Sequence, residues 1–200
     1  MYCVITGDII SSRSLGAGWL KALKLALKKV SKGNKWEIFR GDSFQAEVDP
    51  AEALFALVYI KACIRAQKDA DVRMGVGIGN KLNDRKKLSE SSGDAFVFSG
   101  EAFDGLKQVN MAFKTAFEDF DMEINIALKL ALIAMDNWGI ATAEVVKLAM
   151  EHGPAIQNEL AELSGRTQSS ISEALKRARY SEILELDALY RKKIALLINK

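Results

Sequence analysis

Two aspartates stand where short apolar segments end, and a carboxylate pair of this kind can hold a divalent metal ion. Asp8 follows the apolar run that begins at Tyr2, and Asp42 lies in a Gly-Asp pair between two short strand-like segments. Carboxylate oxygens are ligands that suit Mg²⁺, and a bound Mg²⁺ supports phosphoryl transfer. The pattern therefore predicts a metal site at Asp8 and Asp42, with Mg²⁺ as the expected cofactor.

The residues that follow Asp8 could bind the phosphates of a nucleotide. Backbone amides over 9–12 can donate to phosphate oxygens, and a neighbouring arginine adds positive charge. The predicted nucleotide-binding residues are Asp8, Ile9, Ile10, Ser11, Ser12, Arg13, Arg40 and Asp42. Lys87 is a further cation that could reach this edge. In the alternative interpretation, Asp8 only caps a turn and Asp42 only shapes a hairpin.

The elements that must position these residues are expected in the order β-α-β-β-α-β. Strands are predicted at 2–10, 36–40, 43–48 and 72–78, and helices at 15–30, 51–69 and 95–106. This order is typical of a split β-α-β sandwich of the ferredoxin-like type. A crossover helix makes the first two strands parallel, so the end of the first strand and the Gly41-Asp42 turn should share one edge of the sheet.

Four short motifs in the same order are similar to those of the palm domain of class III nucleotide cyclases and diguanylate cyclases. They are Gly7–Ile10, Arg40–Phe44, Arg73–Gly79 and Gly93–Phe96. The sequence Gly7-Asp8-Ile9-Ile10-Ser11-Ser12-Arg13, taken with Gly41–Gln45, resembles the bacterial SatD family more closely still. The resemblance covers about the first 110 residues. It implies a cyclase-like palm, and no established activity comes with the SatD resemblance.

One departure from the cyclases concerns the helix after Gly93–Phe96. The cyclases place an asparagine and an arginine there to stabilise the transition state, whereas this chain has Val97-Phe98-Ser99-Gly100-Glu101. A missing electrostatic contribution of this kind is often worth ~3–4 kcal/mol. We therefore expect a degenerate cyclase-like domain with little or no turnover.

The C-terminal third is predicted to be helical and to contain a helix-turn-helix. Helices are expected at 120–137, 140–152, 155–163, 168–179 and 187–198, with a short strand or turn near 182–186 that would give a winged form. Gly165 suits the turn, because glycine tolerates a left-handed conformation, and Thr167 is a natural N-cap. The predicted division is an α+β domain at 1–118, a connecting helix at 119–138 and a helix-turn-helix domain at 139–200.

The second helix of this module has the composition of a DNA-recognition helix. Its apolar residues fall on one face, and its N-terminal half is polar, as a helix that enters the major groove requires. The predicted DNA-binding residues are Arg166, Thr167, Gln168, Ser169, Ser170, Ser172, Lys176 and Arg177. Residues 140–200 carry nine basic and eight acidic side chains, so a helical hairpin without nucleic acid is the alternative.

The totals for the whole chain limit the remaining classes. The net charge is +2, so DNA binding must come from a local basic face. Two cysteines in apolar runs suit a reducing cytoplasm, and the longest apolar helical stretch is too short to span a membrane. We expect a homodimeric regulator that binds double-stranded DNA, with an N-terminal domain for dimerisation or for sensing a nucleotide or small molecule. The alternatives are a metal-dependent nucleotidyl-transfer enzyme and a protein-interaction module.

Overall fold

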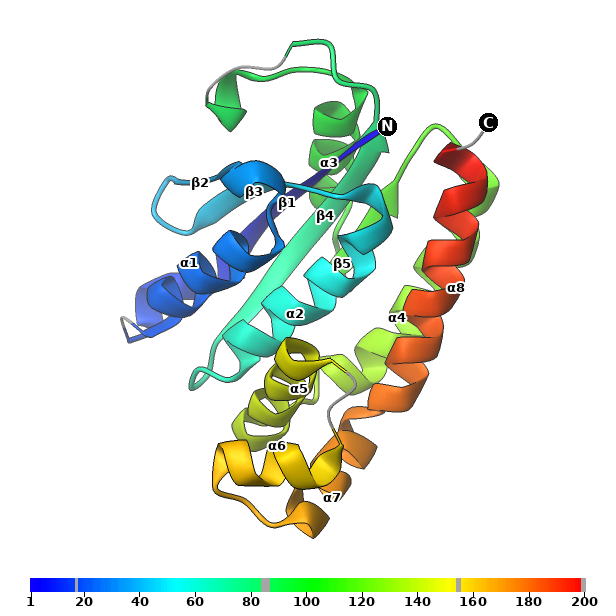
Figure 1. Cartoon of the computed structure of the whole chain (residues 1–200). Coiled ribbons are helices and arrows are strands. Elements are labelled where there is room, and N and C mark those ends of the chain that lie inside the picture. Colours follow the sequence, from blue (N-terminus) through cyan, green and yellow to red (C-terminus); the bar gives the residue numbers. More distant parts are fainter. Residues whose placement is uncertain (17, 84–86, 154–155, 199–200) are drawn as a thin grey trace.

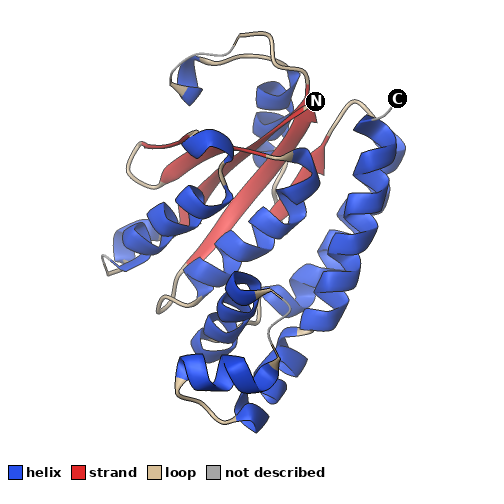
Figure 2. Ribbon diagram, viewed as in Figure 1, coloured by secondary structure: helices blue, strands red, loops and turns tan. Residues whose placement is uncertain are grey.

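A five-stranded mixed sheet forms the N-terminal part of the chain and an all-helical region follows it (Figures 1 and 2). The computed structural model describes residues 1–16, 18–83, 87–153 and 156–198. The strands are β1 (Tyr2–Ile10), β2 (Trp36–Phe39), β3 (Ser43–Val48), β4 (Asp71–Gly79) and β5 (Met111–Lys114). Their order is β2-β3-β1-β4-β5. Only the β4–β5 pair is parallel; the other neighbours are antiparallel.

The strand order agrees with the split arrangement that the sequence predicts. β3 lies between β1 and β2 and is antiparallel to both, so β1 and β2 run in the same direction. The strand β5 was not predicted. Its four residues, Met-Ala-Phe-Lys, are too few to show a clear alternation, and the strand exists because it pairs with β4 at Met74–Gly77.

Helices cover both faces of this sheet (Figure 1). α1 (Gly18–Val30) and α2 (Ala53–Arg65) lie on one face, and α3 (Asp94–Asp104) lies on the other. Short 3-10 turns occur at Ser12–Ser14, Lys32–Asn34, Pro50–Glu52 and Leu88–Glu90. Gly77 allows α3 to approach β4 closely, since a Cβ atom there would lie 2.2 Å from backbone atoms of Ala95 and Ser99.

The helical region consists of α4 (Glu118–Met135), α5 (Ile140–His152), α6 (Gln157–Ser164), α7 (Gln168–Ala178) and α8 (Tyr180–Ile198). α8 runs back beside α4 toward the sheet (Figure 1). The Tyr190 hydroxyl donates to the Pro50 carbonyl over 2.6 Å, and Arg191 pairs with Glu52. One hydrophobic core therefore runs from the sheet into α4 and α8.

The strand or turn expected near 182–186 is wrong, because α8 is continuous from Tyr180. Ile183, Tyr190 and Ile194 recur at helical spacing and are buried, so the segment gains more from packing as a helix than as an exposed hairpin. The described C-terminal residues thus contain no wing. The helix expected from 155 begins at Gln157 among the described residues; 154 and 155 lie outside them. Within the described ranges, no helix is long and apolar enough to cross a membrane.

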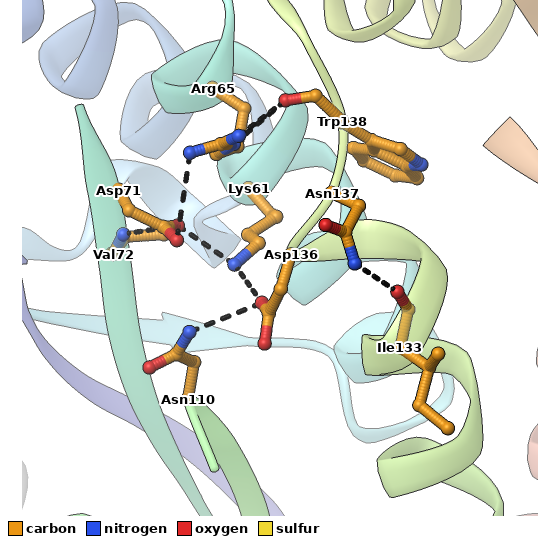
Figure 3. Close-up of polar contacts among 9 residues, drawn as sticks. All are labelled: Lys61, Arg65, Asp71, Val72, Asn110, Ile133, Asp136, Asn137 and Trp138. Carbon is orange, nitrogen blue, oxygen red and sulfur yellow. Dashed lines mark hydrogen bonds and ion pairs between the residues drawn. The ribbon is translucent and has the colours of Figure 1, made fainter. Parts of the chain in front are cut away.

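A buried polar cluster fixes the end of α4 to the sheet (Figure 3). Lys61 of α2 is fully buried and donates to Asp71 Oδ1 over 2.7 Å and to Asp136. Arg65 donates to the Trp138 carbonyl over 2.5 Å and 3.0 Å. One lysine and one arginine of α2 therefore hold the start of β4 and the α4–α5 connection together.

The same cluster extends to α7. Asn110 donates to Asp136 over 3.1 Å, and the Trp138 indole donates to the Ala178 carbonyl at the end of α7 over 3.2 Å. The orientation of the helical region is therefore set by hydrogen bonds as well as by apolar packing.

Candidate functional site

The end of β1 and the β2–β3 turn form a pocket, as the parallel arrangement of β1 and β2 requires. Asp8 is the register partner of Ser43, so Asp42 follows at the same edge. A cavity of about 400 Å³ lies there. Its lining residues are Asp8, Ile9, Ile10, Ser11, Ser12, Arg13, Asp42 and Arg73. The structure thus brings together all the residues of the predicted nucleotide site except Arg40.

Tight turns shape the walls of this sheet-edge pocket. Ser11 has a φ of 54°, and the hairpin turn uses positive φ at Arg40 (53°) and Gly41 (95°). Ser12 Oγ donates to Asp42 Oδ2 over 2.5 Å, and the Ile9 amide donates to the Asp42 carbonyl over 3.3 Å. The two turns are therefore tied to each other through Asp42, while the exposed Arg40 side chain is not part of the lining.

Sequence reasoning missed the partner of Asp8, which is Arg73 on β4. Arg73 Nη2 lies 2.5 Å from Asp8 Oδ2 and its Nε lies 3.0 Å from Oδ1, so the pair is bidentate. The guanidinium also lies over the Phe103 ring, 5.4 Å from its centroid. The hydrogen bonds to Asp8 raise the pKa of Arg73. Asp8 and Arg73 are opposite each other in the antiparallel pairing of β1 and β4, so a correct prediction of this register would have identified Arg73 as the partner.

These contacts fit a metal ion poorly. Both oxygens of Asp8 accept hydrogen bonds from Arg73, and Asp42 accepts one from Ser12. In the described part of the chain, no group of three or more His, Cys, Asp or Glu residues could hold a metal ion. Lys87 pairs with Glu90 instead of lining the pocket. Arg13 is exposed, so the pocket offers a cation to an anionic ligand.

The predicted helix-turn-helix segment consists of α6, a turn and α7. Gly165 has a φ of 66° after α6, and Thr167 Oγ1 accepts from the Ser170 amide over 3.2 Å at the start of α7. α5 packs against both helices. Their shared core contains Val145, Ala149, Leu160, Ala161, Ile171 and Ala174. The turn glycine and the N-cap are therefore where the sequence predicts them.

Most of the predicted DNA-binding residues lie on the outer surface. Thr167, Gln168, Ser169, Ser170, Lys176 and Arg177 are exposed, and Arg166 and Ser172 are partly buried. Among the described residues, Arg177 pairs with Glu173 alone, at 3.4 Å on the surface, and Gln168 donates to Gln157 over 2.6 Å.

Arg166 differs from the rest of the set because its guanidinium is already occupied. It donates to the Ala141 carbonyl over 2.9 Å and lies 2.5 Å from the Glu144 carboxylate. These contacts hold the α6–α7 turn against α5. Sequence analysis alone did not find this structural role, because Glu144 lies 22 residues away.

Comparisons with known proteins agree with the N-terminal motifs and extend beyond them. No curated protein and no solved structure gives a significant match. The SatD family model matches residues 2–185, which include the sheet, α4 to α7 and the first residues of α8. Because this match covers most of the chain, the protein belongs to the SatD family.

Proposed function

We propose that this protein binds double-stranded DNA through α7 and acts as a transcription regulator. The observation that carries the proposal is the division of α7 into two faces. Ile171, Ala174 and Ala178 are buried, whereas Ser169, Ser170 and Lys176 are exposed. A recognition helix needs this division, because one face must pack on its supporting helices while the other enters the major groove.

The residues of α7 would have different tasks. Ser169 and Ser170 stand at the N-terminal end of the helix, where short donor and acceptor groups can reach base edges. Lys176 and Arg177 stand one to two turns later and would contact phosphates, which position a protein without reading sequence. Arg166 keeps the turn in place against Glu144 and is a positioning residue in this proposal.

A homodimer is part of the same proposal, and α4 supplies its surface. Met122, Ile126, Leu130 and Ile133 lie along one side of α4 and are 58%, 55%, 65% and 68% exposed. A contiguous exposed apolar strip of this kind marks an interaction surface. A groove between α4 and α8, lined mainly by alanines and leucines, adjoins it. A ridge beside a groove suits a two-fold interface, in which each copy presents the same patch.

The sheet-edge pocket would bind an anionic effector, such as a nucleotide, through Arg13 and the turn at 11–12. The cavity of about 400 Å³ falls within the range of small-molecule sites. A second candidate function is metal-dependent nucleotidyl transfer by a cyclase-like palm. It would need Asp42 and Asp8 as metal ligands, and Asp8 would first have to break its hydrogen bonds with Arg73. The bidentate Asp8–Arg73 pair favours ligand binding over catalysis.

Fluorescence anisotropy with labelled duplex DNA tests the function directly. Random genomic fragments at low salt should bind the wild type, and Lys176→Ala should weaken binding to every sequence and lower the salt slope by about one unit. Ser169→Ala should change the sequence preference instead. Lys192→Ala is the matched control, because Lys192 is an exposed lysine of α8. Absence of binding at micromolar protein would refute the proposal and favour an interaction module.

A further inference from the structure

The segment from Ile9 to Trp36 has an unusually one-sided charge. It contains seven basic residues and no acidic residue, although the whole chain has a net charge of only +2. The basic residues are Arg13, Lys21, Lys24, Lys28, Lys29, Lys32 and Lys35. The proposed function assigns no role to the six lysines of this segment.

Three of these lysines form a row on one side of α1. Lys21, Lys24 and Lys28 are spaced at i, i+3 and i+7, which places them on the same helix face. All three are exposed, and their side chains make no hydrogen bond or ion pair with any described residue. The remaining lysines differ, because Lys29 lies over the Tyr59 ring and Lys32 and Lys35 pair with acidic residues.

This lysine row begins beside the helix-turn-helix segment. Lys21 lines a cavity between α1, α2 and α5, and Ser164 at the end of α6 and Arg166 of the α6–α7 turn line the same cavity. From Lys21 the row continues along α1 for seven residues, about 10 Å at the rise of an α-helix. The cationic surface of α1 is therefore adjacent to the turn that precedes α7.

We propose that Lys21, Lys24 and Lys28 bind phosphates of the same DNA duplex that α7 contacts, and so widen the footprint of the protein. This inference rests on the proposed function. Residues 140–200 carry nine basic and eight acidic side chains, so the helical region by itself supplies little of the electrostatic attraction that DNA binding needs. The lysine row supplies three cations on an adjoining surface.

The burial of α1 favours DNA over an anionic membrane as the partner. A helix that binds a membrane surface inserts its apolar face into the lipid. In α1 this face is occupied, because Leu23, Ala26 and Leu27 are fully buried against the rest of the protein. The lysines are consequently available for charge contacts at a surface, whereas Leu25, which is 58% exposed, offers too little apolar surface for a membrane to hold the helix.

The test compares two triple variants that lose the same charge. One replaces Lys21, Lys24 and Lys28 by alanine. The other, the matched control, replaces Lys87, Lys107 and Lys192, which are exposed lysines outside α1, α4 and α7. The full chain is titrated with a duplex of about 30 base pairs at several salt concentrations, and binding is followed by fluorescence anisotropy. The magnitude of the slope of log K against log salt should fall by about 2.7 in the α1 variant and stay unchanged in the control. At 100 mM salt its affinity should fall at least roughly tenfold.

Each outcome separates this inference from the proposed function. Wild-type binding with an unchanged salt slope in the α1 variant would overturn the inference and leave the α7 proposal standing. The α7 proposal would be overturned if the α1 variant lost DNA binding while Lys176→Ala and Ser169→Ala left it unchanged. Binding of the wild type to phosphatidylserine vesicles through the same lysines, without binding to DNA, would overturn both. Circular dichroism and thermal unfolding should be the same for the two triple variants.

Discussion

Replacing Lys61 by methionine should destabilise the protein strongly, because this lysine is the cation at the centre of the buried cluster. Lys61 is fully buried and bridges Asp71 and Asp136, whereas methionine keeps most of the apolar volume and removes the charge (Figure 3). Breaking a buried pair by removing one partner typically costs 3–5 kcal/mol. The side chains of Asp71 and Asp136 are 16% and 35% exposed, so water can compensate them in part. We therefore expect a loss of about 3 kcal/mol in the free energy of unfolding.

Urea unfolding followed by tryptophan fluorescence measures this loss. For a chain of this length, about 3 kcal/mol corresponds to a decrease in Tm of roughly 6–12 °C. The control is Lys129→Met, because Lys129 is an exposed lysine of α4 and should change stability by no more than about 0.5 kcal/mol.

A second variant tests whether the uncompensated charge is the cause. Without Lys61, Asp71 still pairs with Arg65 at 3.9 Å, whereas Asp136 is left without a cation among the described residues. Adding Asp136→Asn to Lys61→Met removes this unpaired carboxylate, so the double variant should recover part of the lost stability. Two results would refute the reasoning. One is a free energy of unfolding for Lys61→Met within about 1 kcal/mol of the wild-type value. The other is simple additivity, in which Asp136→Asn lowers the stability of Lys61→Met by as much as it lowers that of the wild type.

The other predictions concern the dimer, the buried thiol and the sheet-edge pocket. Leu130→Glu combined with Ile133→Glu should convert a dimer to a monomer in analytical ultracentrifugation, and an unchanged mass would exclude α4 as the interface. Burial raises the pKa of the Cys63 thiol to about 11. The thiolate fraction of Cys63 at pH 8 is then roughly 0.1%, so alkylation of this thiol in the native protein should be slow. The alkylation rate should rise about tenfold per pH unit. Fast labelling of Cys63 at pH 8 would contradict its burial. Arg13→Ala should weaken binding of a fluorescent GTP analogue about tenfold, as expected for a lost charged hydrogen bond, and Arg40→Ala should not, because Arg40 lies outside the lining. Purified protein should convert little or no ATP or GTP with Mg²⁺ or Mn²⁺, and steady turnover that Asp42→Ala abolishes would show the enzyme hypothesis to be correct.

The sequence by itself determined features that depend on neighbours along the chain. The crossover helix between the first two strands makes them parallel, and this predicts that Asp8 and Asp42 meet at one edge. Gly165 and Thr167 mark the turn and the start of α7 because backbone conformation and capping are local properties. The two short motifs Gly7–Arg13 and Gly41–Gln45 were sufficient for the SatD resemblance.

Tertiary structure decided what depends on residues far apart in the sequence. Arg73 occupies Asp8 only because of the register between β1 and β4, and Arg166 meets Glu144 only because α5 packs across the turn. The segment after α7 is a helix instead of a wing because Ile183, Tyr190 and Ile194 find a buried surface against the rest of the core. Local patterns specify what a segment prefers, whereas burial and ion pairing depend on which distant surfaces the fold brings into contact.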